Sequence, residues 1–201
     1  MNYYYKNNEK GFTLIEMLIS MAIGLIIMAA LSSTFILQRE AYDDQEQIAE
    51  TIQTARAAMD IMTREIRMGG YDPTDAGFNG IPYNAGQLQI LADIDDNAGT
   101  GVSDGDTNDS NEDITYSYDS TNLQIDRNTG GGAQPFAENI QAFTFSYLDS
   151  SGNTTTTTSN IRQIQLTITS RTAQPDRNYT PNSGYRTYTL TSYITPRNLA
   201  F

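Results

Sequence analysis

The 201-residue chain contains no cysteine and no histidine. Without cysteine it forms no disulfide and offers no thiolate to a metal, so cysteine usage says nothing about its redox compartment. Without histidine it lacks the commonest acid or base at neutral pH and every Ser-His or Cys-His nucleophile pair. These two absences argue against an enzyme.

Positive charge is also scarce in this sequence. Twelve basic residues face 24 acidic ones, which gives a formal net charge of −12. After residue 11 there is no lysine, and the ten arginines are scattered along the chain. Binding to a phosphate backbone requires clustered basic side chains, so we expect no nucleic-acid partner.

A long apolar run begins near the N-terminus. Residues 12–37 contain a single ionisable side chain, Glu16. At about 1.5 Å per helical residue, the run is longer than the hydrocarbon core of a bilayer is thick. Lys6 and Lys10 precede it, and basic residues favour the cytoplasmic side of a membrane. We therefore expect a single span with a cytoplasmic N-terminus.

Glu16 separates the possible interpretations of this run. A secretory signal peptide would have a shorter apolar region followed by a small-residue cleavage site. An ordinary anchor helix leaves the carboxylate unexplained, because a charge inside a membrane is costly and usually has a partner. In that second interpretation, Glu16 would simply reach from the membrane edge to water.

Residues 10–16, Lys-Gly-Phe-Thr-Leu-Ile-Glu, resemble the N-terminal signal of prepilins and pseudopilins, the precursors of type IV pilin-like proteins. The resemblance implies that prepilin peptidase removes residues 1–11 as a leader, cutting between Gly11 and Phe12, and that Phe12 is then N-methylated. It also implies an ion pair between Glu16 and the N-terminal amine of a neighbouring subunit. In a low dielectric, each of these two charges requires such a partner.

A helix is expected to continue from the membrane segment through residues 38–70. Residues 38–68 contain no proline or glycine, and Gly69-Gly70 supplies a helix stop. Apolar residues recur every three or four positions along one stripe: Ile48, Ile52, Ala55, Met59, Met62 and Ile66. Because this stripe is too short for a stable coiled coil, we expect it to pack on a sheet.

Residues 71–201 have the pattern of a β-rich domain. Short strand-like segments alternate with clusters of Gly, Asn, Asp, Ser and Thr, which is typical of an antiparallel sheet. We expect strands near residues 87–92, 114–118, 123–127, 140–147, 161–170 and 185–194. The predicted fold is therefore α+β and pilin-like, with a long N-terminal helix packed on an antiparallel β-sheet domain.

An acidic loop is expected at residues 93–113, which hold seven aspartates and one glutamate. Its first half begins like an EF-hand, and the candidate Ca²⁺ ligands are Asp93, Asp95, Asn97 and Asp104. Ala98 occupies the position of the usual glycine, and no flanking helices are expected. A solvated acidic loop is therefore the alternative to a Ca²⁺ site, and no other cofactor is expected.

Five further segments resemble minor pilins of the PilW type: residues 55–60, 64–71, 111–116, 161–164 and 196–198. The absence of a cysteine pair separates the chain from major pilins that have a disulfide-closed loop. The resemblance implies a subunit held in the bacterial inner membrane, with its C-terminal domain in the periplasm, that later enters a filament. Its implied partners are prepilin peptidase, other pilins, the inner-membrane assembly platform and the lipid bilayer.

The expected function is that of a minor pilin in type IV pilus assembly. A J-type pseudopilin of type II secretion shares the same plan, and a Ca²⁺-dependent membrane-anchored adhesin is a further alternative. Glycoside hydrolysis by paired acids such as Asp95 and Asp96 is disfavoured, because a polar loop provides no environment that separates their pKa values.

Overall fold

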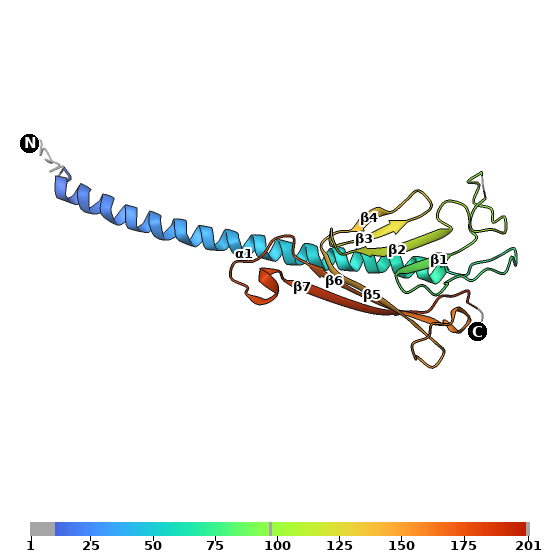
Figure 1. Ribbon diagram of the computed structural model, residues 1–201. Coiled ribbons are helices and arrows are strands. Elements are labelled where there is room, and N and C mark those ends of the chain that lie inside the picture. The colour runs from blue at the N-terminus through green and yellow to red at the C-terminus, as the bar shows by residue number, and fades with distance from the viewer. Residues whose placement is uncertain (1–10, 97, 200–201) are drawn as a thin grey trace, which may run out of the picture. The chain divides into compact units, whose positions relative to one another are not determined.

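The structure, a computed structural model, describes residues 11–96 and 98–199. It contains the long helix α1, Leu14–Met68, followed by seven strands (Figure 1). The chain divides into two compact units, Met1–Gln45 and Glu46–Phe201. Of the expected leader, only Gly11 falls within the described residues, and the membrane boundary at residue 37 stays a prediction.

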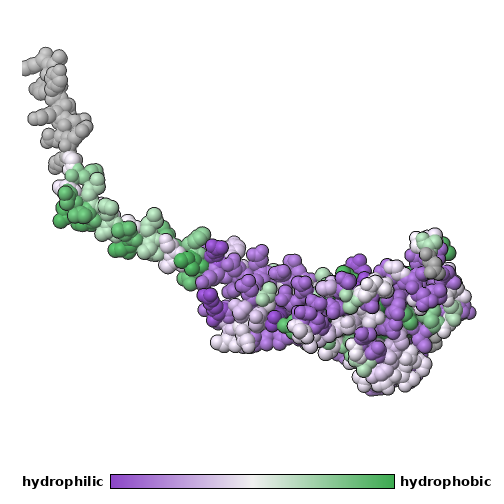
Figure 2. Space-filling view, turned by 45° about the horizontal axis from the view of Figure 1, so that its top comes forward, coloured by the Kyte–Doolittle hydropathy of each residue, from purple (hydrophilic) through white to green (hydrophobic). Residues whose placement is uncertain are grey.

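The N-terminal unit consists of the first part of α1 and the three residues before it. Within the described part of the chain, α1 is the one helix long and apolar enough to cross a membrane, and none of its apolar window is buried. Figure 2 shows the hydrophobic residues gathered over this segment. A helix that is apolar all round needs a lipid or protein environment that covers it.

The C-terminal unit contains two antiparallel sheets. The first has the order β1-β2-β3-β4 and the second has the order β5-β6-β7. The strands span Gln87–Leu91, Asp113–Asp119, Gln124–Asn128, Gln134–Ala137, Ile140–Leu148, Gln163–Arg171 and Thr187–Ile194, in order from β1 to β7. The predicted α+β class, with a long helix packed on antiparallel strands, is confirmed.

Strand β4 was not expected from the sequence. It has only four residues and contains Pro135, which lacks a backbone N–H and is tolerated at a sheet edge. Its place at the edge of the first sheet, paired only with β3, explains why the proline does not disrupt the ladder. The other six strands overlap the expected ranges.

One core joins the helix to both sheets. Four residues of the predicted stripe are buried, Ala55, Met59, Met62 and Ile66, and they pack with inward side chains of both sheets. Every second residue of β6 faces the core, and Ile164, Leu166 and Ile168 are fully buried. Ile48 and Ile52 are only partly buried, whereas the smaller residues Thr51 and Ala58 are buried. At this level the second sheet approaches the helix closely, since the Ser170 hydroxyl donates to the Thr51 carbonyl at 2.9 Å.

A polar cluster pins α1 to the first sheet. Glu65 accepts a hydrogen bond from Arg127 Nη2 at 2.8 Å and another from the Tyr116 hydroxyl. Burial raises the pKa of Tyr116, and the hydrogen bond to Glu65 raises it further. This hydroxyl therefore stays protonated and remains a donor. The side chain of Glu65 is only 15% exposed and therefore depends on these two partners.

Removing the cation from this cluster should destabilise the C-terminal unit. We expect Arg127→Leu to lower the free energy of unfolding by about 2 kcal/mol, because Glu65 loses its cationic partner in a partly desolvated site. Arg64→Leu is the matched control, since its pair with Asp60 is exposed, and we expect a change within about 0.5 kcal/mol. Denaturant unfolding in detergent, followed by tyrosine fluorescence, measures both. Equal losses in the two variants would contradict the pinning role of Glu65.

Candidate functional site

The expected cleavage site lies in an exposed, non-helical segment. Gly11, Phe12 and Thr13 precede the first turn of α1, and the side chain of Phe12 is 85% exposed. A peptidase requires its substrate backbone to be free of helical hydrogen bonds and open to solvent or lipid. Gly11 and Phe12 meet both requirements.

The described part of the fold does not require glycine at position 11. Among the described residues, a Cβ atom added to Gly11 would meet nothing within 4 Å. Gly80 is the opposite case, because an added Cβ would come within 2.1 Å of the backbone nitrogen of Gly70. Any requirement for glycine at position 11 must therefore come from another molecule.

Thr13 and Glu16 form a capping box at the start of α1. The backbone N–H and the hydroxyl of Thr13 donate to Glu16 Oε2 at 2.8 and 2.7 Å, and the backbone N–H of Glu16 donates to the Thr13 hydroxyl at 3.3 Å. This motif was not expected from the sequence, although the Thr-x-x-Glu spacing is a sufficient signal. Among the described residues, nothing donates to Oε1 of Glu16.

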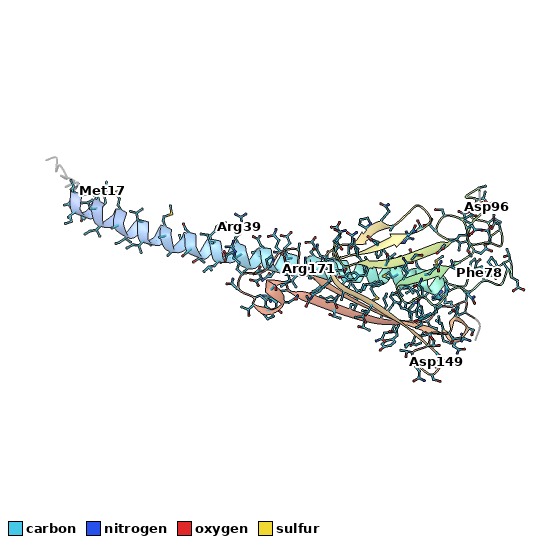
Figure 3. The ribbon with its side chains drawn as sticks, viewed as in Figure 1. Met17, Arg39, Phe78, Asp96, Asp149 and Arg171 are labelled. Carbon is cyan, nitrogen blue, oxygen red and sulfur yellow. The ribbon has the colours of Figure 1, made fainter. Side chains whose placement is uncertain are left out.

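In the acidic loop, the first two candidate calcium ligands bind the chain's own donors. The Asp93 carboxylate is fully buried and accepts bonds from the Thr74 hydroxyl at 3.0 Å and from two backbone N–H groups of the same loop, at 3.1 and 3.2 Å. Asp95 Oδ1 accepts from the backbone of Gly101 at 2.6 Å. Asn97 lies outside the described residues. Asp93 and Asp95 thus hold the loop in shape, and Asp96 marks its position in Figure 3.

Three other carboxylates gather in the second half of the loop. Oxygen atoms of Asp104, Asp106 and Asp109 lie within 4.8 Å of one another. Asp109 Oδ2 is buried and has no hydrogen-bond partner in the described chain. Burial, together with the charges of Asp104 and Asp106, raises the pKa of Asp109. Carboxylate oxygens are the ligands that Ca²⁺ prefers, and a Ca²⁺ ion at this loop stays a prediction.

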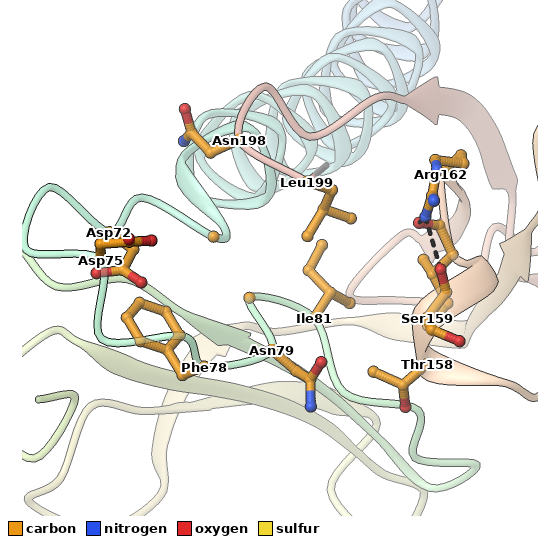
Figure 4. Close-up of a pocket in the computed structure, with 13 residues that line it drawn as sticks. Asp72, Asp75, Phe78, Asn79, Ile81, Thr158, Ser159, Arg162, Asn198 and Leu199 are labelled. Atoms are coloured by element: carbon orange, nitrogen blue, oxygen red, sulfur yellow. Dashed lines mark hydrogen bonds between the residues drawn. The ribbon is translucent and has the colours of Figure 1, made fainter. Parts of the chain in front are cut away.

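The hollows that the described residues of the C-terminal unit form show no catalytic arrangement. One, of about 450 Å³, is lined by Asp72, Phe78 and Arg162 among others (Figure 4). Arg162 donates to the carbonyls of Ser159 and Ile161, and the backbone N–H groups of Gly77 and Ala76 donate to Asp72 and lower its pKa. These polar groups fix loops rather than facing one another.

The comparisons with known proteins identify the N-terminal segment. The prokaryotic N-terminal methylation motif matches residues 6–32. No curated protein matches the chain. Among solved structures, the chain is similar to a type IV-like pilin from Thermus thermophilus, with 13% identity, a TM-score of 0.46, and coverage of 75% of this chain and 97% of that one. The motif match includes Gly11, Phe12 and Glu16, and it confirms the methylation signal expected from residues 10–16.

The raised pKa of Asp109 gives a pH-dependent prediction. Because folding raises this pKa above its ordinary value of 3.8, ionisation of Asp109 destabilises the folded state at neutral pH, and the penalty disappears in acid. We expect Asp109→Asn to raise Tm at pH 7 and to leave it unchanged near pH 3. Glu138→Gln, an exposed site with the same charge change, is the control. A lower Tm for Asp109→Asn at pH 7 would contradict the prediction.

Proposed function

We propose that this chain is a minor pilin subunit of a type IV pilus, cut by prepilin peptidase and acting in pilus assembly. The observation that carries the proposal is the methylation motif at residues 6–32, which coincides with an exposed cleavage segment and a bare apolar helix. The Gly11–Phe12 bond, the residue proposed to be methylated and the proposed membrane anchor are consecutive in the sequence. In this role the protein is structural and has no catalytic function of its own.

The proposed path begins in the bacterial inner membrane. Residues 12–37 span the bilayer once, with the N-terminus in the cytoplasm and residues 71–201 in the periplasm. Prepilin peptidase cuts after Gly11, and the new amine on Phe12 is methylated. The inner-membrane assembly platform then moves the subunit from the bilayer into a filament, where helices of other pilins replace lipid around the apolar segment. The exposed apolar side chains of α1 suit both environments.

Glu16 is proposed to guide this transfer. In the single chain, Thr13 donates to only one oxygen of the Glu16 carboxylate, so Oε1 can accept a bond from the Phe12 amine of a neighbouring subunit. An ammonium and a carboxylate both lose solvation in an apolar environment, and pairing offsets part of that cost. The pair would fix the axial register between subunits.

A J-type pseudopilin of a type II secretion system is the alternative within the same class. The leader junction, anchor helix and α+β domain serve both systems, and the processing experiments below apply to either. Deleting the gene and scoring pilus assembly and protein secretion separately distinguishes the two systems.

Changing Gly11 should block processing and leave the fold intact. Intact-mass analysis of protein from its native membrane should show wild-type chains lacking residues 1–11 and carrying one extra methyl group. Gly11→Ala should retain the leader, with at least a tenfold lower processed fraction. Gly24→Ala is the matched control, because an added Cβ there also meets nothing within 4 Å. An unprocessed wild-type chain would contradict the proposal.

Changing Glu16 should separate assembly from processing. The amide of Glu16→Gln still accepts the capping bonds from Thr13 but cannot neutralise an ammonium. We expect normal cleavage and methylation by mass, and at least a tenfold loss of the protein from sheared filaments. Glu40→Gln carries the same charge change outside the motif and should assemble normally. Normal incorporation of Glu16→Gln would refute the ion pair.

A further inference from the structure

A groove of about 500 Å³ lies beside the C-terminal end of α1. Its lining includes Arg64, Arg67, Met68, Tyr71, Ile94 and Arg197, and we call this surface the arginine groove. The two helical arginines lie one turn apart. The C-terminal segment brings the third beside them, since the Arg197 backbone N–H donates to the Arg67 carbonyl at 3.2 Å. A backbone bond therefore places a third arginine beside the two on the helix.

This concentration of positive charge is unexpected in a chain with a net charge of −12. Arg64 pairs with exposed Asp60, whereas the side chains of Arg67 and Arg197 have no partner within residues 11–96 and 98–199. The partial negative charge at a helix C-terminus accounts for cations on the last turn of α1. It does not account for Arg197, which comes from outside the helix. An anionic partner would offset the mutual repulsion of the three cations.

The groove also has an apolar side. Met68 is 43% exposed and Tyr71 is 44% exposed, and Ile94 lies beside them, partly buried. Large apolar side chains next to unpaired guanidinium groups fit a ligand that carries both carboxylates and an apolar side chain. A peptide segment has both features, whereas inorganic phosphate or a polyphosphate lacks the apolar part.

The chain carries such a segment in its own acidic loop. Val102 is 62% exposed, and the partly exposed carboxylate of Asp106 follows four residues later. Asp106 forms no ion pair with a groove arginine inside the described chain. One carboxylate links the two surfaces, because Glu112 accepts from the backbone N–H of Ile94 in the groove wall at 2.7 Å and from that of Asp109 at 3.2 Å. Groove and loop are therefore neighbours with opposite charge.

We propose that the arginine groove of one copy binds the acidic loop of a second copy of this chain. Asp106 of the second copy would lie between Arg67 and Arg197, while Val102 would pack on Met68 and Tyr71. The groove and the loop are different surfaces. Each copy can therefore bind one neighbour through its groove and another through its loop. The inference goes beyond the proposed function and does not depend on leader cleavage.

A charge-swap experiment on the full-length protein in detergent tests this contact. The groove variant is Arg67→Glu with Arg197→Glu, and the loop variant is Asp106→Arg. Sedimentation velocity should show that wild-type chains associate at low salt, and that each variant alone associates at least tenfold more weakly. A mixture of the two variants should recover association, because it restores opposite charges at both contacts. Recovery in the mixture also shows that both variants are folded.

Controls separate this contact from association through the apolar helix. Arg56→Glu with Arg177→Glu changes two exposed arginines outside the groove and should associate like the wild type. High salt should weaken wild-type association by screening, whereas contacts between apolar helices would persist. The proposal is overturned if the groove variant associates like the wild type or if the mixture stays dissociated. It is also overturned if the groove captures only a different acidic protein while this chain remains monomeric.

Discussion

The packing of one stripe of α1 between the inward faces of two sheets holds the C-terminal unit together. Neither sheet is large, and the first ends in a four-residue strand with a proline, so the strands depend on the helix for a shared core. The helix supplies that surface with four buried apolar residues, Ala55, Met59, Met62 and Ile66. None of them is aromatic, so both sheets can approach the helix. The acidic loop connects β1 and β2, so its position depends on the packing of the first sheet against the helix.

Polar contacts give the apolar packing its specificity. Burial of apolar area is not directional, and a helix with one apolar stripe could slide or rotate along a sheet. Glu65 with Arg127 and Tyr116 fixes α1 against the first sheet, and the bond from Ser170 to the carbonyl of Thr51 fixes it against the second. These few bonds define both the register and the rotation of the helix.

The N-terminal part of α1 follows a different physical rule. Its side chains are apolar all round, and within the unit that contains them nothing covers them, so their environment must come from lipid or from other chains. The only ionisable side chain of residues 12–37, Glu16, lies in the first turn, where it closes a capping box with Thr13. The same residues satisfy the helix end in a single chain, and among the described residues nothing donates to the second oxygen of Glu16. Gly11 and Phe12 are exposed, as the proposed cleavage requires.

The sequence by itself determined the features that depend on neighbouring residues. The methylation motif, the length of the helix, its apolar stripe and most of the strands are short-range patterns, and each was visible without coordinates. Only the tertiary structure showed that Asp93 is buried by Thr74 and its own loop, that Thr51 and Ala58 face the core, and that β4 exists at an edge. The scattered arginines were expected to form no cluster, yet folding brings Arg197 beside Arg64 and Arg67. Such contacts join residues far apart in the chain, and their positions depend on how the two sheets close around the helix, which local patterns do not encode.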